Sequence, residues 1–152
     1  MGGQAVKIVI QIVLGLVIIA LGYWLYISIT EPWEAIERER AVTAMTRDQM
    51  DKVRIALIRH ERVEDRFPGT LDSLLLWVRQ DSIIQSNPDS VFGMAGFNLD
   101  SLLYSPRSGS KFLYSLNDTG RVKIYLLKDP DSDDQIGSET PDVTQLNAAS
   151  WE

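Results

Sequence analysis

The sequence contains no cysteine, so disulfides, thiolate metal sites and cysteine nucleophiles are excluded. It has a single histidine, His60, and it lacks a G-x-S-x-G motif, a phosphate-binding loop and a metal-binding histidine pair. A catalytic histidine needs a nucleophile or an orienting acid, and no such partner motif accompanies His60. We therefore expect a protein that is not an enzyme, with His60 either packed within the fold or exposed to solvent.

Basic residues are missing from the end of the chain. None follows Lys128, whereas seven acidic residues do, and the net charge of the whole chain is −6. A surface of this sign repels nucleic acid and anionic headgroups. We therefore expect no nucleic-acid partner.

Charge is also absent from Ile8 to Ile29, a run of 22 residues that are nearly all apolar. As a helix this run would be about 33 Å long, enough to cross a hydrocarbon core of about 30 Å. Tyr23, Trp24 and Tyr26 near its end are typical of a membrane–water interface. A cleaved signal peptide has a shorter apolar region of about 7–15 residues followed by small residues. We therefore predict a retained transmembrane anchor over residues 1–30, with the lipid bilayer as the partner of residues 8–29.

The charges that flank this run bear on its orientation. Lys7 precedes the run, whereas Glu31, Glu34 and Glu37 follow it before Arg38 appears. Positive flanks favour the cytoplasmic side, although Arg38 argues the other way. We expect the N-terminus in the cytoplasm and the rest of the chain, enough for one small domain, on the far side. For a bacterial chain this means the inner membrane, with the C-terminal domain in the periplasm.

Residues 31–66 are predicted to continue the anchor as one long amphipathic helix. Pro32 suits a first helical turn, and Phe67-Pro68 ends the pattern. The stripe is not a strict heptad, so we expect a neighbour over its second half rather than a free coiled coil. Apolar residues recur mostly at steps of three, four or seven, at Ile36, Val42, Met45, Met50, Val53, Ala56, Leu57 and Val63.

Residues 67–128 are predicted to hold a short helix and a small sheet. Thr70 is a helix-capping residue type, and a helix is predicted from Leu71 to Gln80. Residues 81–98 show no regular pattern. A meander of three antiparallel strands follows, at residues 101–105, 111–116 and 121–127.

Gly120 is expected to supply a left-handed turn conformation between the last two of these strands. The second half of the long helix is the natural cover of such a sheet. The predicted fold class is therefore α+β: an N-terminal transmembrane helix continuing into an amphipathic helix that packs on a small antiparallel sheet.

Residues 129–152 are expected to form an acidic, irregular tail. Its first part brings Asp129, Asp131, Asp133 and Asp134 close together in sequence. Alternating carboxylates can surround a hard cation such as Ca²⁺, but the spacing departs from an EF-hand, which needs Gly at the sixth position and Glu at the twelfth. A calcium site and a plain solvated acidic loop are therefore both open.

The run from Val53 to Leu75 resembles the type IV pilin and type II secretion pseudopilin family. There, a helix reading R-x-A-L-x-x-Y ends at a Y-P-x-x-L-x-x-L turn. Here His60 stands at the tyrosine position and Phe67-Pro68 at Tyr-Pro. The stretch from Asp133 to Ser138 is similar to the acidic closing segment of major pseudopilins, which bind calcium in a similar loop. This resemblance implies a pilin-like fold and raises the expectation of calcium.

The family's leader motif is absent, because no Phe follows Gly2-Gly3 and no acid lies within the apolar run. We therefore expect a pilin-like shape with an uncleaved anchor. The stretches Ser28-Ile-Thr-Glu-Pro-Trp-Glu and Phe67-Pro-Gly-Thr-Leu-Asp-Ser-Leu are also similar to a group of uncharacterised single-pass envelope proteins of Bacteroidota. These resemblances imply a structural or assembly component of a secretion or pilus-like machine, with other membrane or envelope proteins, or further copies of itself, as partners. The alternative is an accessory structural subunit of another inner-membrane complex.

Overall fold

The computed structural model describes residues 2–93, 97–140 and 145–152. The chain divides into two compact units, Met1–Ala41 and Val42–Glu152, which we describe separately. Helix α1 (Gly2–Glu64) supplies all the described structure of the first unit and begins the second. The predicted continuation of the N-terminal apolar helix into a second, longer helical stretch is therefore confirmed, and no break occurs at Pro32.

In the second unit, α1 ends two residues earlier than predicted. Asp65 adopts a left-handed backbone conformation, with φ at 55°, which stops the helix after Glu64. Its carbonyl oxygen accepts a hydrogen bond from the Lys123 ammonium group. Phe67 and Pro68 are then buried in the turn that follows.

Helix α2 (Leu71–Gln80) has the predicted limits. The Thr70 hydroxyl accepts a hydrogen bond from the backbone N–H of Ser73, and the Ser73 hydroxyl accepts one from the N–H of Thr70. This reciprocal pair is a capping box, which satisfies two backbone donors at the start of the helix. The prediction of a Thr70 cap is confirmed.

The segment after α2 is more regular than its sequence suggested. Two short helices, α3 (Ser82–Ser86) and α4 (Pro88–Phe92), lie where no element was predicted. The strand predicted at residues 101–105 is wrong: a 3₁₀ turn, η1 (Leu99–Ser101), and further turns occupy it, with only a single bridge between Tyr104 and Lys111. Leu102 and Leu103 are both buried in this turn, so an apolar run that was read as a strand supplies core residues from an irregular segment.

The sheet has three antiparallel strands, as predicted, but a different third member. Strands β1 (Leu113–Asn117) and β2 (Ile124–Lys128) match two of the predicted strands, and β3 (Gln135–Gly137) comes from the tail expected to be irregular. Their order is β1-β2-β3. Residues 129–152 therefore belong structurally to the second unit.

Gly120 was expected to take a left-handed conformation, but the described glycines with a positive φ are Gly93, Gly109 and Gly137, of which Gly137 lies in the sheet. The φ of Gly137 is 84°, and a Cβ at this position would overlap the carbonyl oxygen of Tyr125 in the neighbouring strand. Gly120 has no positive φ. The requirement for glycine thus comes from the close approach of β3 to β2 and not from the β1–β2 loop.

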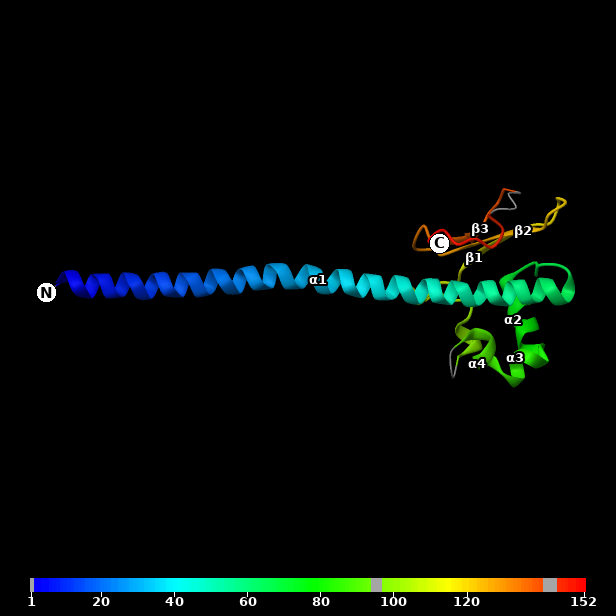
Figure 1. Ribbon diagram of the computed structural model, residues 1–152, viewed down its shortest axis with the longest axis horizontal. Coiled ribbons are helices and arrows are strands. Elements are labelled where there is room, and N and C mark those ends of the chain that lie inside the picture. The colour runs from blue at the N-terminus through cyan, green and yellow to red at the C-terminus, as the bar shows by residue number, and fades with distance from the viewer. Residues whose placement is uncertain (1, 94–96, 141–144) are drawn as a thin grey trace. The chain divides into compact units, whose positions relative to one another are not determined.

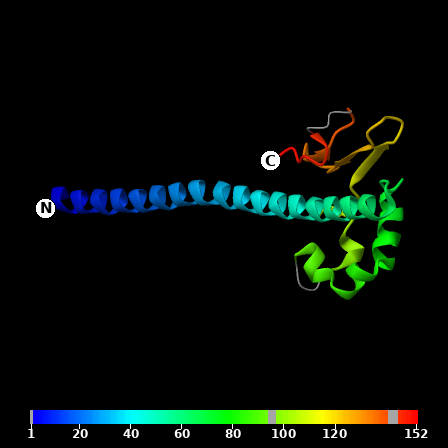
Figure 2. The same ribbon diagram turned by 45° about the vertical axis from the view of Figure 1, so that its right-hand side comes forward.

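The second unit packs around the last part of α1. Figures 1 and 2 show the sheet on one side of this part of the helix and α2, α3 and α4 on the other. Val53, Leu57 and Phe67 share one buried cluster with sheet residues, which confirms the expected packing of the second half of the helix against the sheet. The cluster contains Met50, Val53, Ala56, Leu57, Phe67, Leu71, Leu74, Val78, Ile84, Phe92, Leu102, Leu103, Phe112, Tyr125, Leu127, Ile136 and Ala149.

The helical stripe that faces this core is only partly the predicted one. Met45 and Val63 were placed on it, but they are 60% and 58% exposed. Polar residues are buried instead, at Thr46, Gln49, Lys52 and His60. Each has a partner other than water: for example, the Gln49 amide donates to the carbonyl oxygen of Ser101 at 2.8 Å. Such pairing removes most of the cost of burying a polar group.

Candidate functional site

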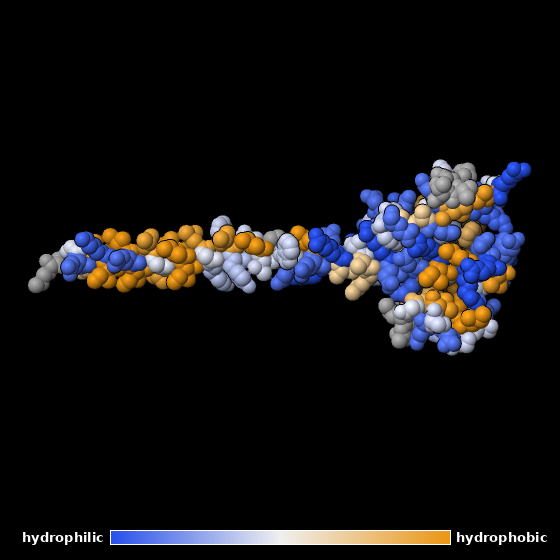
Figure 3. All heavy atoms as spheres, in the orientation of Figure 1, coloured by the Kyte–Doolittle hydropathy of each residue, from blue (hydrophilic) through white to orange (hydrophobic). Residues whose placement is uncertain are grey.

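The first candidate site is the apolar surface of α1 in the first unit. Apart from Ile27, which is less exposed, its large apolar side chains from Val6 to Trp33 are between 47% and 71% exposed. Figure 3 shows the aliphatic side chains among them as hydrophobic atoms along the N-terminal part of the helix, followed by a paler stretch. The N-terminal part of the helix is long and apolar enough to cross a membrane. An apolar surface of this size on a described helix marks a place where lipid or another protein can bind.

The acidic segment at residues 129–134 was the predicted metal site. Two of its carboxylates, those of Asp129 and Asp134, form ion pairs with arginines in the structure. Both oxygens of Asp134 accept hydrogen bonds from Arg47 of α1, at 3.1 and 2.8 Å. This bidentate pair is the strongest geometry available to a carboxylate and a guanidinium. Donation of these hydrogen bonds to Asp134 also raises the pKa of Arg47.

Asp129 is fully buried and is the second of these carboxylates. Its Oδ2 accepts a hydrogen bond from the Ser132 hydroxyl at 2.7 Å and lies 3.4 Å from Nε of Arg107. The guanidinium of Arg107 also donates to the Thr43 hydroxyl on α1, at 3.0 Å. Asp129 and Arg107 therefore form a second link between the acidic segment and the helix.

The other two predicted ligands lie at the surface. Asp131 is exposed and accepts a hydrogen bond from the Ser108 hydroxyl, and Asp133 is exposed. Within the described residues, no group of three or more histidine or acidic side chains is placed to hold a metal ion. Calcium binding by Asp129, Asp131, Asp133 and Asp134 stays a prediction.

A second arginine of α1 holds the end of the chain. Arg54 donates to the carbonyl oxygen of Asn147 at 3.0 Å and to the carboxylate of Glu152 at 2.9 Å. The hydrogen bond from Arg54 lowers the pKa of Glu152. Burial raises the pKa of Asp51, although Arg54 lies 2.8 Å from its Oδ1 and opposes the shift. Near the same end, the guanidinium of Arg47 lies over the ring of Trp151, 5.2 Å from its centroid.

These arginine contacts were missed in the sequence, although a signal for them existed. Arg47 and Arg54 are seven residues apart and therefore lie on one face of the helix. The chain after Lys128 is acidic without a basic residue. A basic helix face and an acidic terminal segment are complementary, and together they indicate ion pairs between these parts of the sequence.

His60 was expected to be either packed within the fold or exposed to solvent, and it is packed. It is 7% exposed, and its Nδ1 lies 2.8 Å from the carbonyl oxygen of Arg66. Its ring meets the edge of Trp77, with 4.9 Å between centroids. These contacts tie the end of α1 to α2 and account for the burial of this residue.

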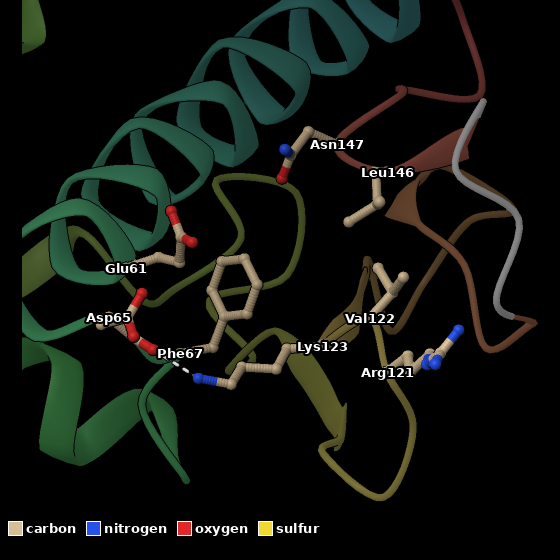
Figure 4. Close-up of a pocket in the computed structure, with 8 residues that line it drawn as sticks. All are labelled: Glu61, Asp65, Phe67, Arg121, Val122, Lys123, Leu146 and Asn147. Carbon is tan, nitrogen blue, oxygen red and sulfur yellow. Dashed lines mark hydrogen bonds between the residues drawn. The ribbon is translucent and has the colours of Figure 1, made fainter.

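A hollow of about 350 Å³ lies beside the end of α1. Figure 4 shows the Phe67 ring at its centre and the side chain of Arg121 turned away from it. The Lys123 ammonium group bonds to the carbonyl oxygen of Asp65 at its rim. The lining residues supply apolar contacts, two carboxylates, two basic groups and an amide, without a hydroxyl, thiol or imidazole. It consists of Glu61, Asp65, Phe67, Arg121, Val122, Lys123, Leu146 and Asn147.

A larger hollow, of about 540 Å³, lies where the turn after α1 meets the end of β1. Its walls combine the apolar side chains of Phe67, Pro68 and Leu116 with the charged side chains of Arg66 and Asp118. The hydroxyl of Tyr114 donates to the carbonyl oxygen of Pro68 nearby, at 2.8 Å.

Comparison with protein-family models, with curated proteins and with solved structures found no match.

Proposed function

We propose that this chain is a non-enzymatic, single-pass membrane protein of the bacterial envelope. Residues 8–29 cross the inner membrane, the N-terminus lies in the cytoplasm, and the second unit works in the periplasm. The protein is a structural or assembly component of a secretion or pilus-like machine, and its partners are other membrane or envelope proteins. Further copies of the same chain are also candidate partners.

The exposed apolar surface of α1 in the first unit is the observation that supports this proposal. Side chains such as Ile18 and Ile19 are 62% and 70% exposed, although they are among the most apolar residue types. Transfer of such side chains out of water stabilises by about 1.5–3 kcal/mol each. A hydrocarbon core supplies that environment along the whole run, with Trp24 and Trp33 as interface residues.

The resemblance to pilins and pseudopilins supports the assembly role. A long helix that begins in an apolar span and ends beneath a small antiparallel sheet is the arrangement that this resemblance implies. The second unit adds a core in which one helix, α1, carries both the apolar contacts to the sheet and the arginines that hold the acidic segment. Such a unit is suited to presenting surfaces to other proteins.

Membrane insertion and orientation are tested on the full chain with a C-terminal tag, expressed in a bacterium. We expect it to stay in the membrane fraction after carbonate washing and its tag to be digested by protease added to spheroplasts. Release by carbonate, or a tag protected in spheroplasts and digested only after lysis, contradicts the proposed insertion or orientation.

The partner class is tested by chemical cross-linking in the intact cell, followed by purification through the tag. A secretion ATPase's membrane platform or a second pilin-like protein among the cross-linked products supports the proposed role. Cross-linking only to subunits of an unrelated inner-membrane complex supports the alternative, an accessory structural subunit, and contradicts the assembly role.

A further inference from the structure

The two edges of the sheet differ in whether another segment of the chain forms hydrogen bonds with them. The edge of β3 is covered by the C-terminal segment: Gly137 N–H donates to the carbonyl oxygen of Ala148 at 2.9 Å, and Ser150 N–H donates to that of Gln135 at 2.8 Å. Ile136 also forms a bridge with the same segment. Covering an edge in this way prevents its pairing with other chains.

The direction of the backbone groups on β2 shows how the opposite edge is arranged. Ser138 N–H donates to the carbonyl oxygen of Tyr125, so the backbone groups of Tyr125 are directed to β3. Backbone groups alternate in direction along a strand, so those of Leu126 are directed to β1. Leu126 is paired with Ser115. The N–H and C=O of Ser115 are therefore directed inward, to β2.

The neighbours of Ser115 must then be directed outward. By the same alternation, the N–H and C=O groups of Tyr114 and Leu116 are directed away from β2. Phe112, two residues before Tyr114, confirms this direction, since its N–H donates to the carbonyl oxygen of Leu103 on the outer side, at 2.9 Å. In the described part of the chain, no backbone hydrogen bond reaches the outward groups of Tyr114 or Leu116.

This open edge lacks the features that protect exposed strands. Strand β1 reads Leu-Tyr-Ser-Leu-Asn, without a charge, a proline or a glycine. Natural edge strands are commonly blocked by lysine, proline or a bulge. An open, uncharged edge is instead the surface that accepts a strand from another chain.

The hollow of about 540 Å³ lies on the core side of this edge. A residue added opposite Leu116 would place its side chain on the same face of the sheet as Leu116, and so beside this hollow. Phe67 and Pro68 supply apolar walls there. The guanidinium of Arg66 also lines the hollow, is exposed, and has no hydrogen-bond or ion-pair partner in the described residues.

We propose that the outer edge of β1 binds an extended, proline-free segment of a partner protein as an added strand. The segment places an apolar side chain opposite Leu116 in the hollow and an acidic side chain beside Arg66. Backbone pairing with Tyr114 and Leu116 supplies affinity, and the hollow supplies selectivity. A second copy of β1 fits less well, because Leu113–Asn117 contains no acidic residue for Arg66.

This inference names a kind of partner for the proposed assembly role, but it can fail separately. All of its residues lie in the second unit, so it does not depend on membrane insertion. If the chain is released by carbonate and the strand still binds, only the membrane proposal fails. If the chain is inserted and no strand binds, only this inference fails.

The test uses the isotope-labelled full chain in detergent micelles and the peptide acetyl-Thr-Ile-Thr-Asp-Thr-amide, whose Ile and Asp lie on one face of an extended strand. Amide hydrogen exchange is followed residue by residue by NMR. We expect the amides of Tyr114 and Leu116 to exchange at least about tenfold more slowly with saturating peptide, because each gains a hydrogen bond. The amide of Ser115, already bonded to β2, serves as the internal control and is expected to change little. Unchanged exchange at Tyr114 and Leu116 up to millimolar peptide overturns the proposal.

A matched peptide separates strand pairing from side-chain contact. The same peptide with N-methyl groups on its second and fourth residues, or on its first, third and fifth, keeps every side chain but loses alternate backbone donors. We expect at least one of the two methylated forms to bind about tenfold more weakly. Equal binding by all three peptides overturns strand addition. Because only the peptide is varied, a change in the folding of the protein cannot explain the result.

Two variants of the protein test the charge at the hollow. Arg66→Gln is expected to weaken binding of the acidic peptide severalfold, whereas Asp118→Asn should strengthen it or leave it unchanged. The reverse order contradicts the assigned role of Arg66. If Tyr114 and Leu116 are protected without peptide, in proportion to the protein concentration, the occupant is a second copy of the chain and the proposed partner class is wrong.

Discussion

The two parts of α1 show how one helix can carry two kinds of apolar surface. Leu16, in the first unit, is 62% exposed, whereas Leu57, in the second, is fully buried. Both are leucines on the same continuous helix. The difference comes from what surrounds them: the sheet and the shorter helices cover Leu57 within the second unit, whereas within the first unit the side chain of Leu16 is open to its surroundings. Apolar side chains of α1 that the chain buries belong to the folded second unit. Apolar side chains of α1 that stay exposed form a surface that lipid or another protein can cover.

The largest expected effect comes from a charge in the buried part of the helix. Leu57→Asp would place an unpaired carboxylate in the cluster that Leu57 shares with Tyr125 and Leu127. We expect the free energy of unfolding of the second unit to fall by about 4 kcal/mol or more. Chemical denaturation of the full chain in mild detergent measures this change. An unfolding midpoint equal to that of the unmodified chain means that the packing described here is wrong.

The same substitution in the exposed part is the matched comparison. Ile18→Asp, near the middle of the apolar run, should leave the unfolding of the second unit unchanged. It should cost about 2.5–3.5 kcal/mol of membrane insertion, the cost of an aspartate at the centre of a span. The carbonate-resistant fraction measures insertion. If Ile18→Asp destabilises the second unit while insertion stays complete, the contrast between the two parts of the helix fails.

Short-range patterns in the sequence predicted α1 and α2 but not the short helices α3 and α4. Thr70, followed three residues later by Ser73, carries the capping signal locally, so α2 has its predicted limits. The end of α1 was predicted within two residues because Phe67-Pro68 cannot continue a helix. The apolar stripe predicted Val53 and Leu57 as core residues, and both are fully buried.

Long-range pairing decided what the sequence could not show. Strand β3 has only three residues, Gln-Ile-Gly, which is too short for alternation to be recognised. It exists because β2 lies beside it and because Gly137 tolerates a φ of 84°. Likewise, burial of Gln49 and Lys52 depends on the backbone and rings that they meet, at Ser101 and Phe97. The candidate metal site had the same weakness, because arginines distant in sequence lie against two of its carboxylates.

Removing an ion pair from each part of α1 is expected to give a smaller difference in the free energy of unfolding. Arg59 makes a bidentate pair with Asp81, whose side chain is 8% exposed, whereas Arg38 pairs with Glu34, and the side chains of these two residues are 78% and 60% exposed. We expect Arg59→Gln to lower the free energy of unfolding by about 2 kcal/mol and Arg38→Gln to leave it within about 0.5 kcal/mol. Denaturation at pH 7 measures both. Equal effects would mean that burial of the pair does not matter.

The pair with Asp81 also predicts a pH dependence. Burial alone would raise the pKa of Asp81, but hydrogen bonds from Arg59 and from the N–H groups of Ile83 and Ile84 lower it. A lowered pKa in the folded state stabilises the fold above the unfolded value of about 3.9. That stability is lost as the pH falls through the folded pKa. Asp81→Asn keeps the helix-capping oxygen but not the charge, so its deficit in stability should narrow below about pH 4. A deficit independent of pH contradicts this assignment.

The smallest expected effect concerns calcium. Two of the candidate ligands, Asp129 and Asp134, already neutralise arginines in the folded state, and a calcium ion would have to displace Arg107 and Arg47 from them. Release of Arg47 would also break the contact of the acidic segment with α1. We therefore expect millimolar Ca²⁺ to leave the thermal unfolding of the full chain where EDTA leaves it.

A rise in the unfolding temperature with Ca²⁺ and not with equal Mg²⁺ would contradict this expectation. An ion held by the folded state alone stabilises it by about 2.7 kcal/mol at 100 times its dissociation constant. Mg²⁺ gives up its bound water reluctantly and is the matched control. In that case, Asp131→Asn/Asp133→Asn should abolish the rise, because these exposed carboxylates are the ones free of arginine. Persistence of the rise in this double variant would place the ion elsewhere on the chain. If Ca²⁺ does not raise the unfolding temperature of the unmodified protein, Asp129 and Asp134 bind arginines in place of a metal ion. The role of the acidic segment is then to attach itself to α1 through these ion pairs.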